Sequence, residues 1–97
     1  MWPFKKKTND SQKLRDLAEK TYAEAVEIVD KDYKEEIFPL LKRDVEKGAK
    51  KFEYVFGAPG NMTRELYNHL LIKKLRKEGF RNIKLYNGHV NTFKFTL

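Results

Sequence analysis

Hydrophobic residues recur every three or four positions along the first part of the chain. This spacing places side chains on one face of an α-helix. The residues that share the face are Leu14, Ala18, Tyr22, Ala25 and Val29. The pattern therefore predicts an amphipathic helix from Ser11 to about Val29, which Asn9, Asp10 or Ser11 itself would cap.

The same hydrophobic stripe continues for four more turns, through Tyr33, Ile37, Leu41 and Val45. Pro39 lies within it, and a proline has no amide hydrogen to donate to the carbonyl of Glu35. The pattern leaves open whether this region is one bent helix or two, with Asp30-Lys31-Asp32 as another place for a break. Gly48 suits the end of the helical region.

The next segments alternate between strand and helix periods. Lys51–Phe56 has the two-residue period of a strand, with Phe52, Tyr54 and Phe56 on one face. Gly57 to Gly60 ends this strand. A second amphipathic helix is predicted from about Met62 to Glu78. Its apolar arc holds Leu66, Tyr67, Leu70, Leu71 and Leu75, and its polar arc holds Glu65, His69, Lys73 and Arg76.

The last eighteen residues predict a hairpin with two possible turns. Asn87-Gly88 suits a two-residue turn, but that register would point the last three hydrophobic side chains away from the first two. A three-residue loop, Tyr86-Asn87-Gly88, places Ile83, Leu85, Phe93, Phe95 and Leu97 on one face. Burial of each large side chain contributes about 1.5–3 kcal/mol. We therefore predict this loop, with Gly88 in a left-handed bulge position, although a bulge in the last strand would serve as well.

These elements predict an α+β fold with a helical N-terminal region followed by strand, helix, strand and strand. We expect a three-stranded mixed sheet with the helices packed on one face. A single domain would span residues 11–97, after a flexible basic and aromatic tail at residues 1–10. The buried sheet face would contain Phe52, Tyr54, Ile83, Leu85, Phe93 and Phe95.

Parts of this pattern are similar to small uncharacterised α+β proteins encoded by bacteriophages and prophages. The matching segments, about half of the chain, are Glu46 to Tyr54, Leu70 to Phe80 and Gly88 to Leu97, and the start Met-Trp-Pro-Phe-Lys-Lys-Lys is of the same kind. The resemblance implies an accessory or host-interference protein in the cytoplasm of a bacterial host. It carries no catalytic residues over.

Positive charge is concentrated in the C-terminal part of the chain. Ala58 to Leu97 holds eight Lys and Arg residues against two acidic residues, out of a net charge of +7. Such asymmetry indicates an anionic partner, although an ordinary solvated surface would carry a similar cluster. The predicted anion-binding or nucleic-acid-binding residues are Lys73, Arg76, Lys77, Arg81 and Lys84, with Tyr86 placed to stack on a base.

Gly57, Gly60 and Asn61 form a second candidate site. Amides at the start of a helix can hold a phosphate group, and these residues lie between the predicted strand and helix. The Gly-Lys-Ser/Thr continuation of a nucleotide-binding P-loop is missing. A plain turn is therefore the competing interpretation.

Catalytic and metal chemistry have little support. The chain has no cysteine and only His69 and His89, and a calcium loop at Asp30 would need Gly where Glu35 stands. No apolar run is long enough to cross a membrane. We expect no enzymatic activity, no cofactor, no metal and no stable membrane insertion.

Three functions follow in order of preference. The first is a small binding protein that occupies the surface of a host macromolecule. The second is a nucleic-acid-binding accessory protein that uses the C-terminal basic surface. The third is a nucleotide binder that uses the glycine loop. The expected partner is a host protein or nucleic acid, and the oligomeric state is left open.

Overall fold

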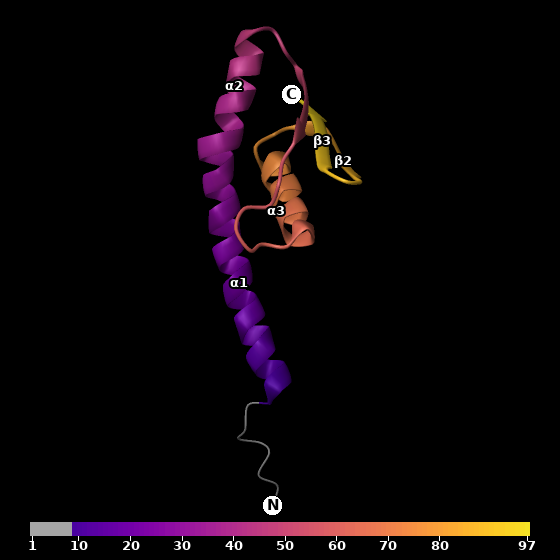
Figure 1. Ribbon diagram of the computed structural model, residues 1–97. Coiled ribbons are helices and arrows are strands. Elements are labelled where there is room, and N and C mark those ends of the chain that lie inside the picture. The colour runs from indigo at the N-terminus through magenta and orange to yellow at the C-terminus, as the bar shows by residue number, and fades with distance from the viewer. Residues whose placement is uncertain (1–8) are drawn as a thin grey trace, which may run out of the picture.

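The computed structural model describes residues 9–97, and it opens with one long helical rod (Figure 1). The rod consists of α1 (Asp10–Asp32), a π-helical turn η2 (Tyr33–Ile37) and α2 (Phe38–Glu46). The Asn9 side chain caps it by accepting a hydrogen bond from the Gln12 amide at 2.8 Å. Residues 1–8 of the predicted tail lie outside the described residues. Asp10, which the prediction placed in the tail, is the first residue of α1.

The π-helical turn keeps the helix continuous at Pro39. The amide of Phe38 donates to the carbonyl of Tyr33, five residues earlier. The turn that precedes the proline is therefore widened, and the helix does not break. Hydrophobic positions spaced by four residues drift by about 40° per step on a regular α-helix, and the wider turn reverses part of that drift. The buried stripe is Ala25, Val29, Tyr33, Ile37 and Leu41.

The rest of the chain forms a three-stranded sheet and one further helix. The elements are β1 (Lys51–Val55), α3 (Arg64–Lys77), β2 (Arg81–Asn87) and β3 (Asn91–Thr96). Thr63 caps α3 by accepting from the Leu66 amide at 3.2 Å. The α+β class is confirmed. The prediction of a mixed sheet was wrong, because β3 lies between β1 and β2 and runs antiparallel to both.

Strand β3 pairs on both edges and holds the two most deeply buried rings of the sheet. Phe93 and Phe95 are 0% and 1% exposed, against 4% for Phe52 in the edge strand β1. The parallel strands β1 and β2 are thereby separated and make no direct pairs with each other. All backbone ladders are antiparallel in consequence.

The hairpin has the predicted loop length at a different place. Asn87 pairs with Asn91, so the loop is Gly88-His89-Val90, two residues later than predicted. A shift of two residues leaves every side chain on its predicted face. A bulge lies in β2, between Arg81 and Lys84, where Asn82 has a φ of 54°. Gly88 is not left-handed, and that prediction was wrong.

The shared sheet face is confirmed. Phe52, Phe93 and Phe95 are buried, and Tyr54, Ile83 and Leu85 are half-buried against the same core. Helix α3 packs its predicted apolar arc between this face and α1, with Tyr67, Leu70, Leu71 and Leu75 buried and Leu66 half-buried (Figure 1). At the ends of the predicted N-terminal stripe the outcome differs, because Leu14, Tyr22 and Val45 are exposed.

Two glycines allow a matched test of these backbone conformations. Gly79 follows α3 with a φ of +94°, whereas Gly88 has no positive φ, and an added Cβ meets nothing within 4 Å at either position. Gly79→Ala should therefore lower the free energy of unfolding by about 1 kcal/mol. Gly88→Ala should be neutral or slightly stabilising. Urea denaturation of both variants checks this, and an equal loss at the two positions would contradict the hairpin geometry.

Candidate nucleic-acid interface

The sheet face that points away from the helices forms three rows of three side chains, which we call the outer sheet face. Directly paired residues share a face, so the strand register defines the rows. They are Arg81, Thr96 and Lys51; Lys84, Lys94 and Glu53; and Tyr86, Thr92 and Val55. All nine are exposed or half-buried. The face is therefore open to a partner along its whole length.

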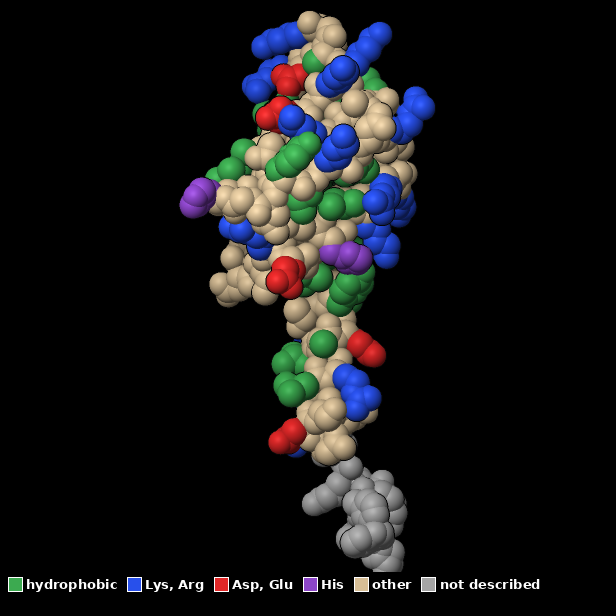
Figure 2. All heavy atoms as spheres, turned by 90° about the vertical axis from the view of Figure 1, so that its right-hand side faces the viewer, with side chains coloured by type: hydrophobic (Ala, Val, Ile, Leu, Met, Phe, Trp, Pro, Cys, Tyr) green, Lys and Arg blue, Asp and Glu red, His purple; other side chains and the backbone are tan. Residues whose placement is uncertain are grey.

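Four cations and one acid give this face a positive charge. Lys94 lies 3.5 Å from the Glu53 carboxylate, and its ammonium also lies over the Tyr86 ring, 5.3 Å from the centroid. Lys84 is directly paired with Lys94 on the neighbouring strand. Opposed like charges destabilise a sheet, and an anion bound between the two lysines would relieve that repulsion. In Figure 2, Lys and Arg side chains gather on the part of the molecule that holds the sheet and α3.

Tyr86 supplies an aromatic surface beside these cations. The residue is 50% exposed and lies near the end of β2, one residue before the strand ends at Asn87. Arg64 from the start of α3 donates to the Asn87 side chain at 3.1 Å and to the Gly88 carbonyl at 3.2 Å. These bonds tie the hairpin loop to α3, so Tyr86 is carried on an anchored strand end.

The predicted anion-binding residues, five cations and Tyr86, divide into two groups. Arg81, Lys84 and Tyr86 lie together on the outer sheet face, whereas Lys73, Arg76 and Lys77 are exposed on α3, which packs on the opposite face of the sheet. Lys94 belongs to the basic cluster of the C-terminal sequence but was not among the predicted binding residues, although the hairpin alone pairs it with Lys84. Lys51 was not predicted, because only the pairing of β1 with β3 brings it to this face.

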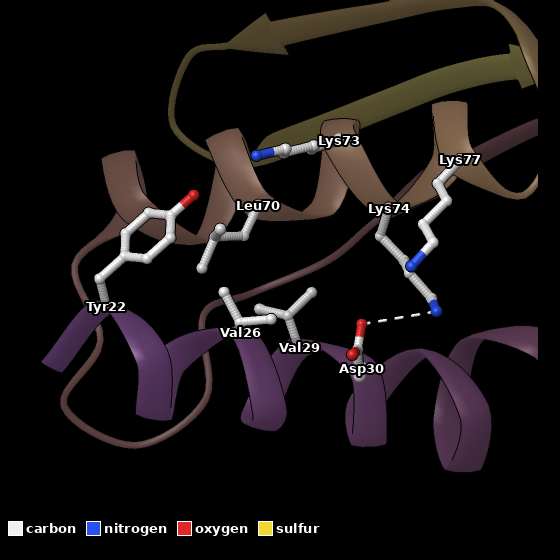
Figure 3. Close-up of a pocket in the computed structure, with 8 residues that line it drawn as sticks. All are labelled: Tyr22, Val26, Val29, Asp30, Leu70, Lys73, Lys74 and Lys77. Atoms are coloured by element: carbon white, nitrogen blue, oxygen red, sulfur yellow. Dashed lines mark ion pairs between the residues drawn. The ribbon is translucent and has the colours of Figure 1, made fainter. Parts of the chain in front are cut away.

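The α3 lysines border a groove between α1 and α3 (Figure 3). Val26 and Val29 from α1 and Leu70 from α3 project into it, and its volume is about 170 Å³. Lys74 lies 3.4 Å from Asp30 and 3.1 Å from Glu78. Its charge is thus balanced within the protein, which leaves Lys73 and Lys77 as the cations of the groove.

Three groups where the N-terminal helical rod meets α3 have raised pKa values, and one of them, Lys74, borders the groove. Burial raises the pKa of Tyr67, and the Asp32 carboxylate, which accepts a 3.0 Å hydrogen bond from the Tyr67 hydroxyl, adds to the effect. Burial and then Glu78 raise the pKa of Tyr33. Burial alone would lower the pKa of Lys74, but Glu78 and Asp30 outweigh it and the pKa is raised. All three groups hold their protons more tightly in the folded state.

This proton binding predicts a loss of stability at alkaline pH. A pKa raised by folding stabilises the protein below the unfolded pKa, near 10.0 for tyrosine and 10.5 for lysine, and this stability is lost as pH rises. The free energy of unfolding should therefore fall above about pH 10.

Tyr67→Phe should lower the free energy of unfolding by about 1 kcal/mol at neutral pH, and it should flatten the decline of stability at alkaline pH. Denaturation across pH 8–11 checks this, with the exposed Tyr86→Phe as the matched control; an unchanged profile in Tyr67→Phe would contradict it.

The glycine loop has a different setting from a phosphate site. It lines a groove against α1 in which no Lys or Arg takes part and Glu24 stands opposite. The Leu66 amide near the start of α3 is already bonded to Thr63. Among residues 9–97, no Lys or Arg lines the groove that Gly60 and Asn61 border, and Gly57 lies outside its lining, so the phosphate interpretation gains no support from the geometry.

Within residues 9–97, no three His, Cys, Asp or Glu side chains gather in a way that could hold a metal ion. Over the same residues, no helix combines the length and the apolar character needed to cross a membrane. Comparison with protein-family models, with curated proteins and with solved structures found no match to this chain.

Proposed function

We propose that this chain is a small non-enzymatic binding protein that binds single-stranded nucleic acid on the outer sheet face. The observation that carries the proposal is the exposed Tyr86 ring beside the opposed pair of Lys84 and Lys94. An aromatic platform flanked by cations suits a strand whose bases stack while its phosphates meet the cations. A role as an accessory or host-interference factor would then act through a nucleic acid of the host.

The composition of the face favours nucleic acid over a protein partner. Its cations outnumber its acids by four to one, and Val55 is its only aliphatic side chain. The centres of protein–protein interfaces are depleted in charged residues, Lys in particular. Occupation of a host protein surface is therefore the less favoured form of the same binding function.

A single strand is favoured over a duplex. Bases in a duplex are stacked on one another, so the Tyr86 ring would have no base to stack on. A short single strand of about 4–16 nucleotides matches the range bound by other small stacking platforms. We expect weak dependence on base sequence, because every base offers a π-face.

The salt dependence of binding tests the proposal. Fluorescence anisotropy with a labelled oligothymidine of about 12 nucleotides should show binding at roughly 50 mM salt. With about three phosphates neutralised, the log–log slope against salt should lie near −2, since each contributes about −0.7 on a single strand. The matching duplex should bind more weakly, and a polyaspartate of similar charge serves as the polyanion control. Lack of retention at this salt concentration would remove the proposal.

A further inference from the structure

The N-terminal part of α1 projects beyond the body of the protein (Figure 1). No residue from 11 to 24 is buried, although Leu14 and Leu17 are hydrophobic and are 64% and 58% exposed. Hydrophobic side chains are visible along this projection in Figure 2. A helical segment of this length is only marginally stable in water unless one of its faces is packed. We call Leu14 and Leu17 the apolar ridge.

An apolar groove of about 340 Å³ lies beside the next turns of α1. Ala25 and Ile28 border it from α1, and Met62 and Leu66 border it from the start of α3 and the loop before it, with Glu24 at its edge on α1. Leu66 also borders the shallower depression along the projecting part of α1. The apolar ridge and this apolar groove therefore form one continuous surface.

We propose that two copies of this chain form an antiparallel, two-fold symmetric dimer in which the apolar ridge of each copy lies in the apolar groove of the other. A two-fold interface uses the same surface twice and requires that it be complementary to itself. Helix α1 carries both the apolar ridge and one wall of the apolar groove. Leu17 of the ridge and Ile28 of the groove lie eleven residues apart. An antiparallel pairing that sets Leu17 against Ile28 of the second copy fills both grooves at once, because the two-fold symmetry repeats the contact.

The charges beside the ridge favour this direction. Lys20 and Glu27 lie seven residues apart on the same flank of α1, and neither has an ion-pair partner among residues 9–97. In the proposed register, Lys20 lies level with Ala25 of the second copy and reaches Glu27, two residues further along the same flank, and symmetry repeats the pair. A parallel pairing would instead bring Glu24 against Glu24 of the second copy, which is repulsive. Opposite charges therefore select the antiparallel arrangement.

The expected dimer is reversible. The paired part of α1, about 20 residues, is about 30 Å long and about 10 Å wide. Each copy then contributes a few hundred Å², which is below the roughly 800 Å² per partner of a standard interface. We expect dissociation constants in the micromolar range, so that dilution separates the copies.

Sedimentation equilibrium of the full chain, from about 1 to about 500 μM, tests the dimer. The unmodified chain should change from monomer to dimer over this range, with helicity rising in parallel. Leu17→Glu should weaken association at least tenfold, because it buries a charge in the groove of the second copy. Ala23→Glu, which adds the same charge on the opposite side of the helix, should not. A monomer at every concentration would overturn the proposal, as would a dimer that Leu17→Glu leaves intact.

A charge exchange tests the direction of pairing. Lys20→Glu and Glu27→Lys should each weaken the dimer about tenfold, since each creates two pairs of like charges. The double variant restores both pairs and should return the dissociation constant to that of the unmodified protein. Weakening without recovery would overturn the antiparallel register. These residues lie far along α1 from the outer sheet face, so the result is independent of nucleic-acid binding.

Discussion

Phe93→Ala should lower the free energy of unfolding by about 3–5 kcal/mol. Phe93 is 0% exposed at the centre of β3. Its ring centroid lies 5.7 Å from that of Phe56 and 6.4 Å from that of Tyr67, the latter in an edge-on contact. The substitution removes a ring that joins the sheet to α3 and leaves a cavity between them. Because a domain of this size has about 5–15 kcal/mol in total, the variant should be close to unfolding at 37 °C.

Urea denaturation followed by circular dichroism measures this loss. Phe93→Leu retains most of the volume and should cost less than half as much. Val55→Ala, on the exposed side of the sheet, is the control and should change stability by no more than about 0.5 kcal/mol. A loss below about 1 kcal/mol in Phe93→Ala would mean that β3 turns its other face to the core.

The local elements of this fold could be predicted from hydrophobic spacing alone. The two-residue period of Phe93 and Phe95 placed them on the face of Ile83 and Leu85, and this placement survived the shift of the hairpin loop. The sheet face on which each side chain lies can be predicted reliably, because a shift of the loop by two residues does not change it. The loop position is less determined, because three-residue loops at two places satisfy the same parity.

The sheet order could not be predicted in the same way. Strand order depends on which strand pairs on both edges, whereas hydrophobic spacing shows only which face of a strand is buried: Phe52 in the edge strand β1 is buried like Phe93 and Phe95 in the central strand β3. The Asn68–Asn91 hydrogen bond, at 2.8 Å in the core, likewise joins residues 23 apart that carry no local signal. The candidate site depended in part on the same information, because Lys51 joins Lys84 and Lys94 only through the pairing of β1 with β3, whereas Lys84 and Lys94 already share a face in the predicted hairpin.

The projecting part of α1 shows the opposite limitation. Leu14 and Tyr22 have the spacing of core residues, yet they are exposed. A periodic stripe indicates that a helix face is suited to packing, but it does not identify the surface that covers it. The predicted stripe packs within the chain at Ala25 and Val29, and the prediction fails only towards the start of α1, where Leu14 and Tyr22 are exposed.

Lys84→Gln combined with Lys94→Gln should flatten the salt dependence of binding to single-stranded nucleic acid. Each phosphate contact contributes about −0.7 to the log–log slope, so the loss of two of about three contacts should change the slope from about −2 to about −0.7. The affinity at roughly 50 mM salt should fall by about 10- to 100-fold. Stability should change by less than about 1 kcal/mol, because the substitutions remove an opposed pair of like charges together with the exposed Lys94–Glu53 ion pair.

Tyr86→Ala separates stacking from charge on the same face. It should lower affinity by about 5- to 100-fold, in line with about 1–3 kcal/mol per stacked base, and it should leave the salt slope unchanged. Lys73→Gln with Lys77→Gln is the matched control, since it removes the same charge from the groove on the other side of the sheet. If that pair flattened the slope and the Lys84 and Lys94 pair did not, the interface would lie on α3. The two sets of variants thus assign the bound strand to one face of the protein.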